Sequence, residues 1–369
     1  MLKEFPSEIY LPGKTVFKKG AADSLVSEAL EFGAAGLLIH GKSLEKSGKL
    51  QEILARFPSS IKIKTICRSG GEPELEEISA AIGQGRNINT KWVAGIGGGS
   101  VLDLAKAVAG LFNAKENPAY YQQNGELKEI GIPFIAVPTT AGTGSEATIN
   151  SVIINKEKKA KLSIRDKSFI ARKVILDPGL LNELPPDVIA SSGMDALVQA
   201  YEAYTSKHST KFTDMLAMRA ITLINQHILA AHKAPNDENL SAMLIGSYYA
   251  GIALANARLG VVHGIAHSLG VLYGKPHGQI CAVCLPASIK LNKAAMGNKY
   301  ALITREVGLD FLERAEALMQ LLMIRSPFKG RDIIDREKII KDTLESGSTA
   351  ANPKQITRED VEFLLKELF

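Results

Sequence analysis

The first half of this chain alternates short apolar runs with amphipathic stretches, and the alternation stops near residues 182–186. Strands that alternate with helices favour a doubly wound, largely parallel α/β sheet. The predicted strands occupy residues 35–40, 62–67, 91–97, 133–139, 151–155 and 173–178. Residues 44–57 and 72–85 carry apolar side chains at i, i+3, i+4 and i+7, which is typical of helices.

The second half contains only helical patterns, separated by glycine and proline. Its last segment begins at Thr357, with Asp360 three residues later, and this spacing predicts a capped helix start. A chain of 369 residues exceeds the usual size of one hydrophobic core. We therefore expect a Rossmann-like α/β domain over residues 1–183 and an all-helical domain over residues 184–369.

The charge distribution argues against nucleic acid as a partner. The 44 Lys and Arg against 39 Asp and Glu leave a net charge of +5, without an arginine run or interleaved aromatic residues. The N-terminus has no signal-peptide pattern, and we expect no membrane span, which needs roughly 18 uncharged residues. We expect a cytoplasmic protein with no membrane partner.

The three cysteines are Cys67, Cys281 and Cys284. An odd and small number of cysteines argues against a disulfide framework. Cys281 and Cys284 lie in an apolar run without a second pair, so we interpret them as core residues and not as a redox or metal pair.

Residues 95–110, "GIGGGSVLDLAKAVAG", place Gly97, Gly98 and Gly99 between a predicted strand and a helix that Ser100 opens. Backbone N–H groups can approach an anion closely there, and a helix N-terminus carries partial positive charge. The spacing is not G-x-G-x-x-G, so a simple tight turn is the alternative. A second loop of small residues, 138–148, follows another strand, and two such loops at one sheet end can face one dinucleotide.

The turn after the first predicted strand bears on which dinucleotide binds. It offers Gly41, Lys42 and Ser43, where a carboxylate would hold the 2′-hydroxyl of NAD. Because Lys42 or Ser43 can hold a 2′-phosphate instead, we favour NADP(H) over NAD(H).

Three histidines fall within fifteen positions, 263–277, among mostly apolar neighbours. His263 and His267 are four residues apart and share a helix face, and His277 follows a turn. A lone histidine here would be interpreted as a core residue, but three unpaired buried imidazoles would cost about 1–3 kcal/mol each. A shared role as metal ligand or proton shuttle is the better explanation. Asp195 and Gln199, also four apart on a predicted helix, are candidates for further ligands.

The segments "GGGSVLDLAK", "PTTAGTGSE", "GMDAL", "NARLGVVHGIAHSLG" and "PHGQICAVCLP" occur in this order. Together they resemble the iron-containing (group III) alcohol dehydrogenase family over nearly the whole chain. The resemblance implies a dinucleotide-binding α/β domain, a helical metal and substrate domain, and an active site in the cleft between them. It implies an NAD(P)-dependent enzyme that transfers a hydride reversibly between nicotinamide C4 and a small alcohol or aldehyde.

The resemblance also implies roles for cofactor-binding residues. The pyrophosphate would be held by Gly97, Gly98, Gly99, Ser100, Thr139 and Thr140. The cofactor cleft would be lined by Asp103, Ser145 and Lys161. Family members with glycine at the position of Gly41 generally resemble NADP users.

For the metal, the resemblance implies a divalent ion, Fe²⁺ or Zn²⁺, held by Asp195, His263 and His277, with His267 as proton relay. The family has a histidine where this chain has Gln199, and an amide oxygen is a weaker donor than imidazole nitrogen. Three outcomes stay open: Gln199 as a weaker fourth ligand, water in its place, or a metal-free enzyme.

Three further positions are candidates for substrate contacts. Leu254 stands where the family often has phenylalanine, and either widens the pocket or forms an equivalent wall. Arg258 either binds an anionic substrate tail or faces solvent. Asn150 either touches substrate or nicotinamide or is a structural amide.

Two alternatives to the dehydrogenase are a dehydroquinate synthase-like cyclase or lyase on the same fold and a non-catalytic nucleotide-binding protein. A small molecule is the expected partner, and similar proteins are commonly homo-oligomers, dimers or larger.

Overall fold

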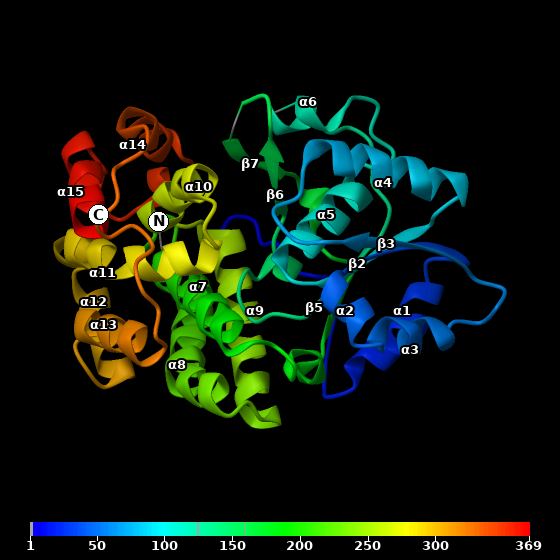
Figure 1. The fold of residues 1–369 in the computed structure, drawn as a ribbon, viewed down its shortest axis with the longest axis horizontal. Coiled ribbons are helices and arrows are strands. Elements are labelled where there is room, and N and C mark those ends of the chain that lie inside the picture. Colours follow the sequence, from blue (N-terminus) through cyan, green and yellow to red (C-terminus); the bar gives the residue numbers. More distant parts are fainter. Residues whose placement is uncertain (1–2, 124, 159) are drawn as a thin grey trace. The chain divides into compact units, whose positions relative to one another are not determined.

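The computed structural model describes residues 3–123, 125–158 and 160–369, which form two compact units (Figure 1). The α/β unit comprises Tyr10–Thr140 and Ser145–Asn182. The helical unit comprises Ala141–Gly144, Glu183–Phe369 and the described residues up to Ile9. The predicted fold class, a parallel α/β half followed by an all-helical half, is confirmed.

A six-stranded sheet with the order β1-β8-β5-β4-β2-β3 lies at the centre of the α/β unit, and every neighbouring pair is parallel. Its strands are β1 (Lys14–Phe17), β2 (Ala35–Gly41), β3 (Lys62–Arg68), β4 (Trp92–Gly97), β5 (Phe134–Pro138) and β8 (Lys173–Leu176). Strand order reverses between β2 and β4, since β3 lies on the other side of β2. In such sheets ligands bind beyond the carboxyl ends of the strands at this switch point.

Helices cover both faces of this sheet. Figure 1 shows α4 and α5 on one face and α1, α2 and α3 on the other. They are α1 (Leu25–Leu30), α2 (Lys42–Lys46), α3 (Lys49–Ala55), α4 (Leu75–Asn87) and α5 (Gly99–Gly110), and the short α6 (Pro118–Gln122) follows.

Side chains of β4 alternate between the two layers. Trp92, Ala94 and Ile96 enter the core shared with α1 to α3. Gly95 faces α5 so closely that an added Cβ would lie 2.8 Å from Cβ of Ala105. This close packing fixes α5 against the carboxyl half of β4.

Three details differ from the prediction. The helix predicted over 44–57 is two helices, because Gly48 adopts a left-handed φ of 78° between α2 and α3. The predicted strand at 151–155 does not join the parallel sheet; as β6 (Asn150–Asn155) it pairs antiparallel with β7 (Ala160–Arg165). Strands β1 and β7 were not predicted; β1 is four residues long and half-exposed at the sheet edge.

The helical unit contains α7 (Pro186–Thr205), α8 (Lys211–Lys233), α9 (Asp237–Ala257), α10 (Val261–Tyr273), α11 (His277–Met296), α12 (Asn298–Val307), α13 (Phe311–Leu321), α14 (Arg336–Glu345) and α15 (Arg358–Leu368). As predicted, Thr357 caps α15: its side chain accepts from the Asp360 backbone N–H, and the Asp360 carboxylate accepts from the Thr357 N–H.

The expectation that no stretch is long enough for a membrane span is wrong: residues 239–257 are uncharged, and helix α9, which contains them, is long and apolar enough to cross a membrane by composition alone. It packs against α7 and α8, and 72% of its most apolar window is buried inside the structure. We therefore assign α9 as the core helix of the helical unit.

Candidate cofactor and metal sites

The glycine turn lies at the carboxyl end of β4, next to the switch point. Gly97 is buried at the strand end, whereas Gly98, Gly99 and Ser100 are partly exposed. Helix α5 begins at Gly99, with Gly98 as its N-cap. Ser100 was predicted to open the helix, but it lies inside the first turn. Among the described residues no side chain caps this N-terminus, although the N–H groups of Val101 and Leu102 donate to the Gly98 carbonyl. A helix start without a side-chain cap can accept an anion.

The second loop lies directly beside the glycine turn. Thr139 follows β5, the neighbour of β4, and its backbone N–H donates to the Gly97 carbonyl over 3.0 Å. Both Thr140 side-chain atoms Cγ2 and Oγ1 would be 3.4 Å from a Cβ added at Gly98. The structure thus brings the two predicted loops together at one end of the sheet.

A buried network fixes the loop that follows. Asp103 of α5 accepts hydrogen bonds from the Ser145 hydroxyl over 2.5 Å and from the Val152 N–H over 3.1 Å. Lys106 donates to the Ser145 carbonyl, to Thr148 Oγ1 and to the Asn150 carbonyl. Asp103 and Ser145 therefore tie α5 to the start of β6.

Burial shifts the protonation of this network. The loss of solvation raises the pKa of Asp103 and lowers the pKa of Lys106 to about 8. It also raises the pKa of the adjacent Glu146 to about 7. Each shift disfavours the charged form in a site with little water.

Gly41, Lys42 and Ser43 form the turn after β2, on the other side of the switch point. Gly41 has an ordinary φ of −80°, and a Cβ there would meet only atoms 3.7 Å away or farther. The fold therefore does not itself require glycine at this position. Glu45 of the next turn hydrogen-bonds the Cys67 thiol, which is one cause, after burial, of the raised pKa of Cys67.

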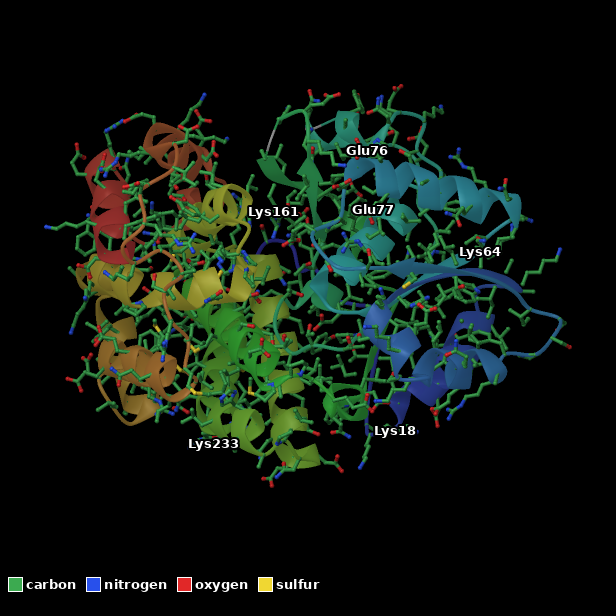
Figure 2. All side chains as sticks on the ribbon, viewed as in Figure 1. Lys18, Lys64, Glu76, Glu77, Lys161 and Lys233 are labelled. Atoms are coloured by element: carbon green, nitrogen blue, oxygen red, sulfur yellow. The ribbon has the colours of Figure 1, made fainter. Side chains whose placement is uncertain are left out.

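Two other cofactor or substrate candidates lie on the β6-β7 hairpin. Lys161 of β7, labelled in Figure 2, pairs with Glu72 over 2.7 Å. Asn150 is the first residue of β6, and its carbonyl is held by Lys106.

In the helical unit the predicted histidines converge. His263 Nε2 lies 3.4 Å and His277 Nε2 lies 3.9 Å from Oδ1 of Asp195. The His267 ring is 5.5 Å from the His277 ring, between centroids. The structure therefore brings Asp195 of α7, His263 and His267 of α10, and His277 of α11 to one place.

Close helix packing produces this convergence. A Cβ added to Gly278 would lie 2.3 Å from the Ser191 carbonyl oxygen and 3.4 Å from Cβ of Asp195. Because Gly278 has no side chain, the start of α11 can contact α7 directly. His277, one residue before, is thereby brought within reach of Asp195.

Glu202 is a functional candidate that the sequence analysis missed. Its Oε2 lies 2.6 Å from His263 Nδ1, and its Oε1 accepts from the Val262 N–H over 2.7 Å. The carboxylate thus caps the N-terminus of α10 and fixes the His263 ring so that Nε2 faces Asp195. A sequence signal was present: Asp195, Gln199 and Glu202 are spaced i, i+4 and i+7 on α7.

Cys281 was interpreted as core, and it is fully buried, but it also belongs to this cluster. Its Sγ lies 3.6 Å from His277 Nε2 and 3.9 Å from His263 Nε2. Single ligand atoms of Asp195, His263, His277 and Cys281 all lie within 4.8 Å of one another. The missed signal is the i, i+4 spacing of His277 and Cys281. Cys284 is buried outside this group.

The charge of the cluster suits a cation. Burial opposes a charged imidazolium at His263, but Cys281, Asp195 and Glu202 outweigh it and hold the pKa of His263 well above its ordinary value. Burial raises the pKa of the Cys281 thiol to about 12. Among the described residues, none donates a hydrogen bond to Oδ1 of Asp195 or to Oε1 of Gln199, and both atoms are buried. A buried carboxylate oxygen without a donor is costly unless a cation meets it.

The remaining substrate candidates lie near the end of α9. Leu254 is buried, as an apolar wall would be. Arg258 is exposed and ends α9 with a positive φ of 64°.

Two family models match the chain. The model described as iron-containing alcohol dehydrogenase matches residues 12–178, and the model of the C-terminal part of the same family matches residues 189–369.

Curated relatives match over most of their length. Alcohol dehydrogenase 4 of Saccharomyces cerevisiae is 32% identical over 88% of this chain and 87% of its own. Lactaldehyde reductase of Escherichia coli is 30% identical, with 94% and 95% covered. An NADPH-dependent butanol dehydrogenase of Clostridium saccharobutylicum is 28% identical, with 95% of both chains covered.

Solved structures agree with the fold. A 1,3-propanediol oxidoreductase superposes with a TM-score of 0.91 at 29% identity, covering 98% of this chain and 99% of its own. A sulfoacetaldehyde reductase of Bifidobacterium kashiwanohense, in complex with NAD+, superposes with a TM-score of 0.90 at 27% identity, covering 98% of both chains.

Proposed function

This chain belongs to the iron-containing alcohol dehydrogenase family, and from that premise we propose how its own residues divide the work of an NAD(P)-dependent alcohol dehydrogenase or aldehyde reductase. The predicted family and oxidoreductase activity are confirmed. The reaction is a reversible hydride transfer between nicotinamide C4 and a small alcohol or aldehyde. We assign cofactor binding to residues 1–183 and metal and substrate binding to residues 184–369.

In the first domain, the uncapped N-terminus of α5 binds the pyrophosphate through the backbone of Gly97 to Ser100. Thr139 and Thr140, which adjoin Gly97 and Gly98, supply further donors. Asp103 and Ser145 act by holding the loop in place, since they bond each other. Lys161 and Asn150 flank the cofactor from the β6-β7 hairpin.

NADP(H) is the favoured cofactor. The position that would carry the NAD-binding carboxylate is Gly41, although the space there would accept a side chain. The exposed Lys42 and Ser43 can bind a 2′-phosphate instead. Glu45, a carboxylate in the first turn of α2, forms a hydrogen bond with Cys67. The similar butanol dehydrogenase is NADPH-dependent, whereas the similar sulfoacetaldehyde reductase was solved with NAD+.

In the second domain, Asp195, His263 and His277 would hold a divalent ion, Fe²⁺ or Zn²⁺. The observation that carries this proposal is Oδ1 of Asp195, which is buried beside two imidazole nitrogens and receives no hydrogen bond from any described residue. A bound ion would supply Lewis-acid polarisation of the carbonyl oxygen. Gln199 replaces a family histidine, and its own buried, unbonded Oε1 suits a weaker ligand or a water-bridged one.

His267 moves the proton. It is partly exposed and lies next to His277, so it can pass a proton between the substrate oxygen and solvent, directly or through water and the ribose hydroxyls. Leu254 forms an apolar pocket wall, and the exposed Arg258 attracts substrates with an anionic tail. We further propose that the protein is cytoplasmic and assembles as a dimer or larger homo-oligomer.

The experiment is a panel of alcohols and aldehydes with NADP(H) and NAD(H), followed at the nicotinamide absorbance with Fe²⁺, Zn²⁺ or chelator. We expect turnover with NADPH, loss of turnover in chelator, and recovery on adding a divalent ion. Full activity in a protein that contains no metal would reject the ion. Arg258→Ala should weaken the preference for acidic over neutral aldehydes, and an unchanged preference would reject its role.

A further inference from the structure

We propose that Cys281 is the fourth protein ligand of the divalent ion, and that its thiolate gives the site a preference for zinc. This inference rests on the metal site proposed above, with Asp195, His263 and His277 as the other ligands. It changes the interpretation of Cys281 from a core residue to part of the active site.

The distances are those of a tetrahedral donor set. Zinc bonds of about 2.0 Å to nitrogen and oxygen and about 2.3 Å to sulfur imply N···S separations of about 3.5 Å and N···O separations of about 3.3 Å. In the structure, Sγ of Cys281 lies 3.6 and 3.9 Å from Nε2 of His277 and His263. Oδ1 of Asp195 lies 3.4 and 3.9 Å from the same nitrogens. These four separations slightly exceed those of such a centre, and all four atoms lie within 4.8 Å of one another.

The backbone fixes each donor in place. His277 and Cys281 occupy one face of the first turns of α11, which Gly278 brings against α7. Glu202 occupies Nδ1 of His263 and leaves Nε2 facing Cys281. The donorless Oδ1 of Asp195, on the opposite helix, is an independent sign that a cation belongs among these atoms.

Charge and softness favour Cys281 over Gln199 as the fourth ligand. A thiolate together with the Asp195 carboxylate balances the two charges of the ion, which matters because Asp195, His263 and Cys281 are all nearly inaccessible to solvent. The amide of Gln199 adds no charge. Thiolate sulfur also prefers Zn²⁺ to Fe²⁺ more strongly than nitrogen and oxygen donors do. On binding, the thiol proton passes to solvent as the metal–sulfur bond forms.

Cobalt provides the first test. Full-length protein is stripped of metal and titrated with Co²⁺, whose thiolate complexes absorb in the near ultraviolet by ligand-to-metal charge transfer. We expect this band in the wild type and in Cys284→Ala, and its loss in Cys281→Ser. Cys284→Ala is the matched control, because Cys284 is an equally buried thiol on the same helix outside the cluster. A Co²⁺-loaded wild type without the band overturns the proposal.

Zinc provides the second test. X-ray absorption at the zinc edge should show one sulfur at about 2.3 Å in the wild type. Repeating it on Cys67→Ser, which removes the thiol from the second group of possible ligands, His40, Glu45 and Cys67, assigns the sulfur even if Cys281→Ser folds poorly. We also expect the zinc dissociation constant to rise at least tenfold in Cys281→Ser, and the ratio of zinc to iron affinity to fall.

The outcomes separate this inference from the proposed function. A zinc shell of nitrogen and oxygen alone, or no zinc bound, overturns the role of Cys281 while NADPH turnover is judged separately. Absence of turnover with every substrate overturns the proposed function, whatever the zinc shell contains.

Discussion

The buried carboxylate of Glu202 fixes both a metal-ligand candidate and the start of a helix. It bonds the ring of His263 and the N-terminus of α10 at once. In Glu202→Gln the side-chain NH₂ group must face one of the two nitrogens that the carboxylate now contacts, Val262 N or His263 Nδ1. The negative charge beside the imidazole ring is also lost. We expect zinc affinity to fall about 10- to 100-fold, as for other residues that orient a metal ligand.

Competition with a chromogenic chelator measures this affinity. Glu306→Gln is the control, because Glu306 accepts a hydrogen bond from Thr222 and lies outside the metal cluster. Equal zinc affinity in Glu202→Gln and wild type would contradict an orienting role for Glu202.

Glu146 makes stability depend on pH. Burial raises its pKa from 4.5 to about 7 in the folded protein. Because the folded state then holds the proton more tightly, its contribution to stability is full below pH 4.5 and is lost as the pH rises through 7. We expect the free energy of unfolding to fall between pH 5 and 7, by up to a few kcal/mol.

Urea unfolding of Glu146→Gln at pH 5, 6, 7 and 8 isolates this effect from other titrating groups. The variant carries no proton to lose at this position, so its stability should change less over the same range. Parallel curves for the variant and the wild type would show that Glu146 titrates normally.

Among the elements, the turn from β4 to α5 contains two glycines with different roles: Gly97 is needed for packing, and Gly98 for binding the anion. A Cβ at Gly97 would lie 2.6 to 2.9 Å from three atoms of Val101, whereas a Cβ at Gly98 would meet only Thr140, at 3.4 Å. Gly98 also has an ordinary φ of −74°. We therefore expect Gly97→Ala to destabilise the fold by about 1–3 kcal/mol.

Gly98→Ala should instead leave the melting temperature nearly unchanged and weaken NADPH binding about tenfold or more, because the new methyl group obstructs the anion site. Calorimetry of NADPH binding, with thermal unfolding of both variants, distinguishes the two positions. Tight NADPH binding by a folded Gly98→Ala would place the pyrophosphate elsewhere.

The elements that the sequence predicted well are those with local causes. Buried parallel strands are continuous apolar runs, and the i, i+4 spacing of His263 and His267 on α10 is fixed by helix geometry. The places where prediction failed depend on partners distant in sequence. Cys281 and Glu202 acquire their neighbours only when α7, α10 and α11 pack together. The break at Gly48 depends on one backbone angle.

At the scale of the molecule, three segments of the chain make up the helical unit, and Ala141–Gly144 is the shortest of them. There Gly144 has a φ of 59°, and an added Cβ would lie 2.6 Å from the Cα of Gly251 in α9. Neither the conformation nor the space admits a side chain. We expect Gly144→Ala to destabilise the protein by at least about 2 kcal/mol.

Two spectroscopic probes can show which unit loses stability in Gly144→Ala. Far-ultraviolet circular dichroism reports chiefly on the helices, while Trp92, the single tryptophan, lies in the α/β unit. Because Gly144 contacts α9, the urea midpoint by circular dichroism should fall more than the midpoint by Trp92 fluorescence. Gly83→Ala is the control: Gly83 is exposed in α4 with no atom within 4 Å of an added Cβ, so alanine should stabilise by about 0.5–1 kcal/mol. A Gly144→Ala protein as stable as Gly83→Ala would mean that Ala141–Gly144 can leave α9 at no cost.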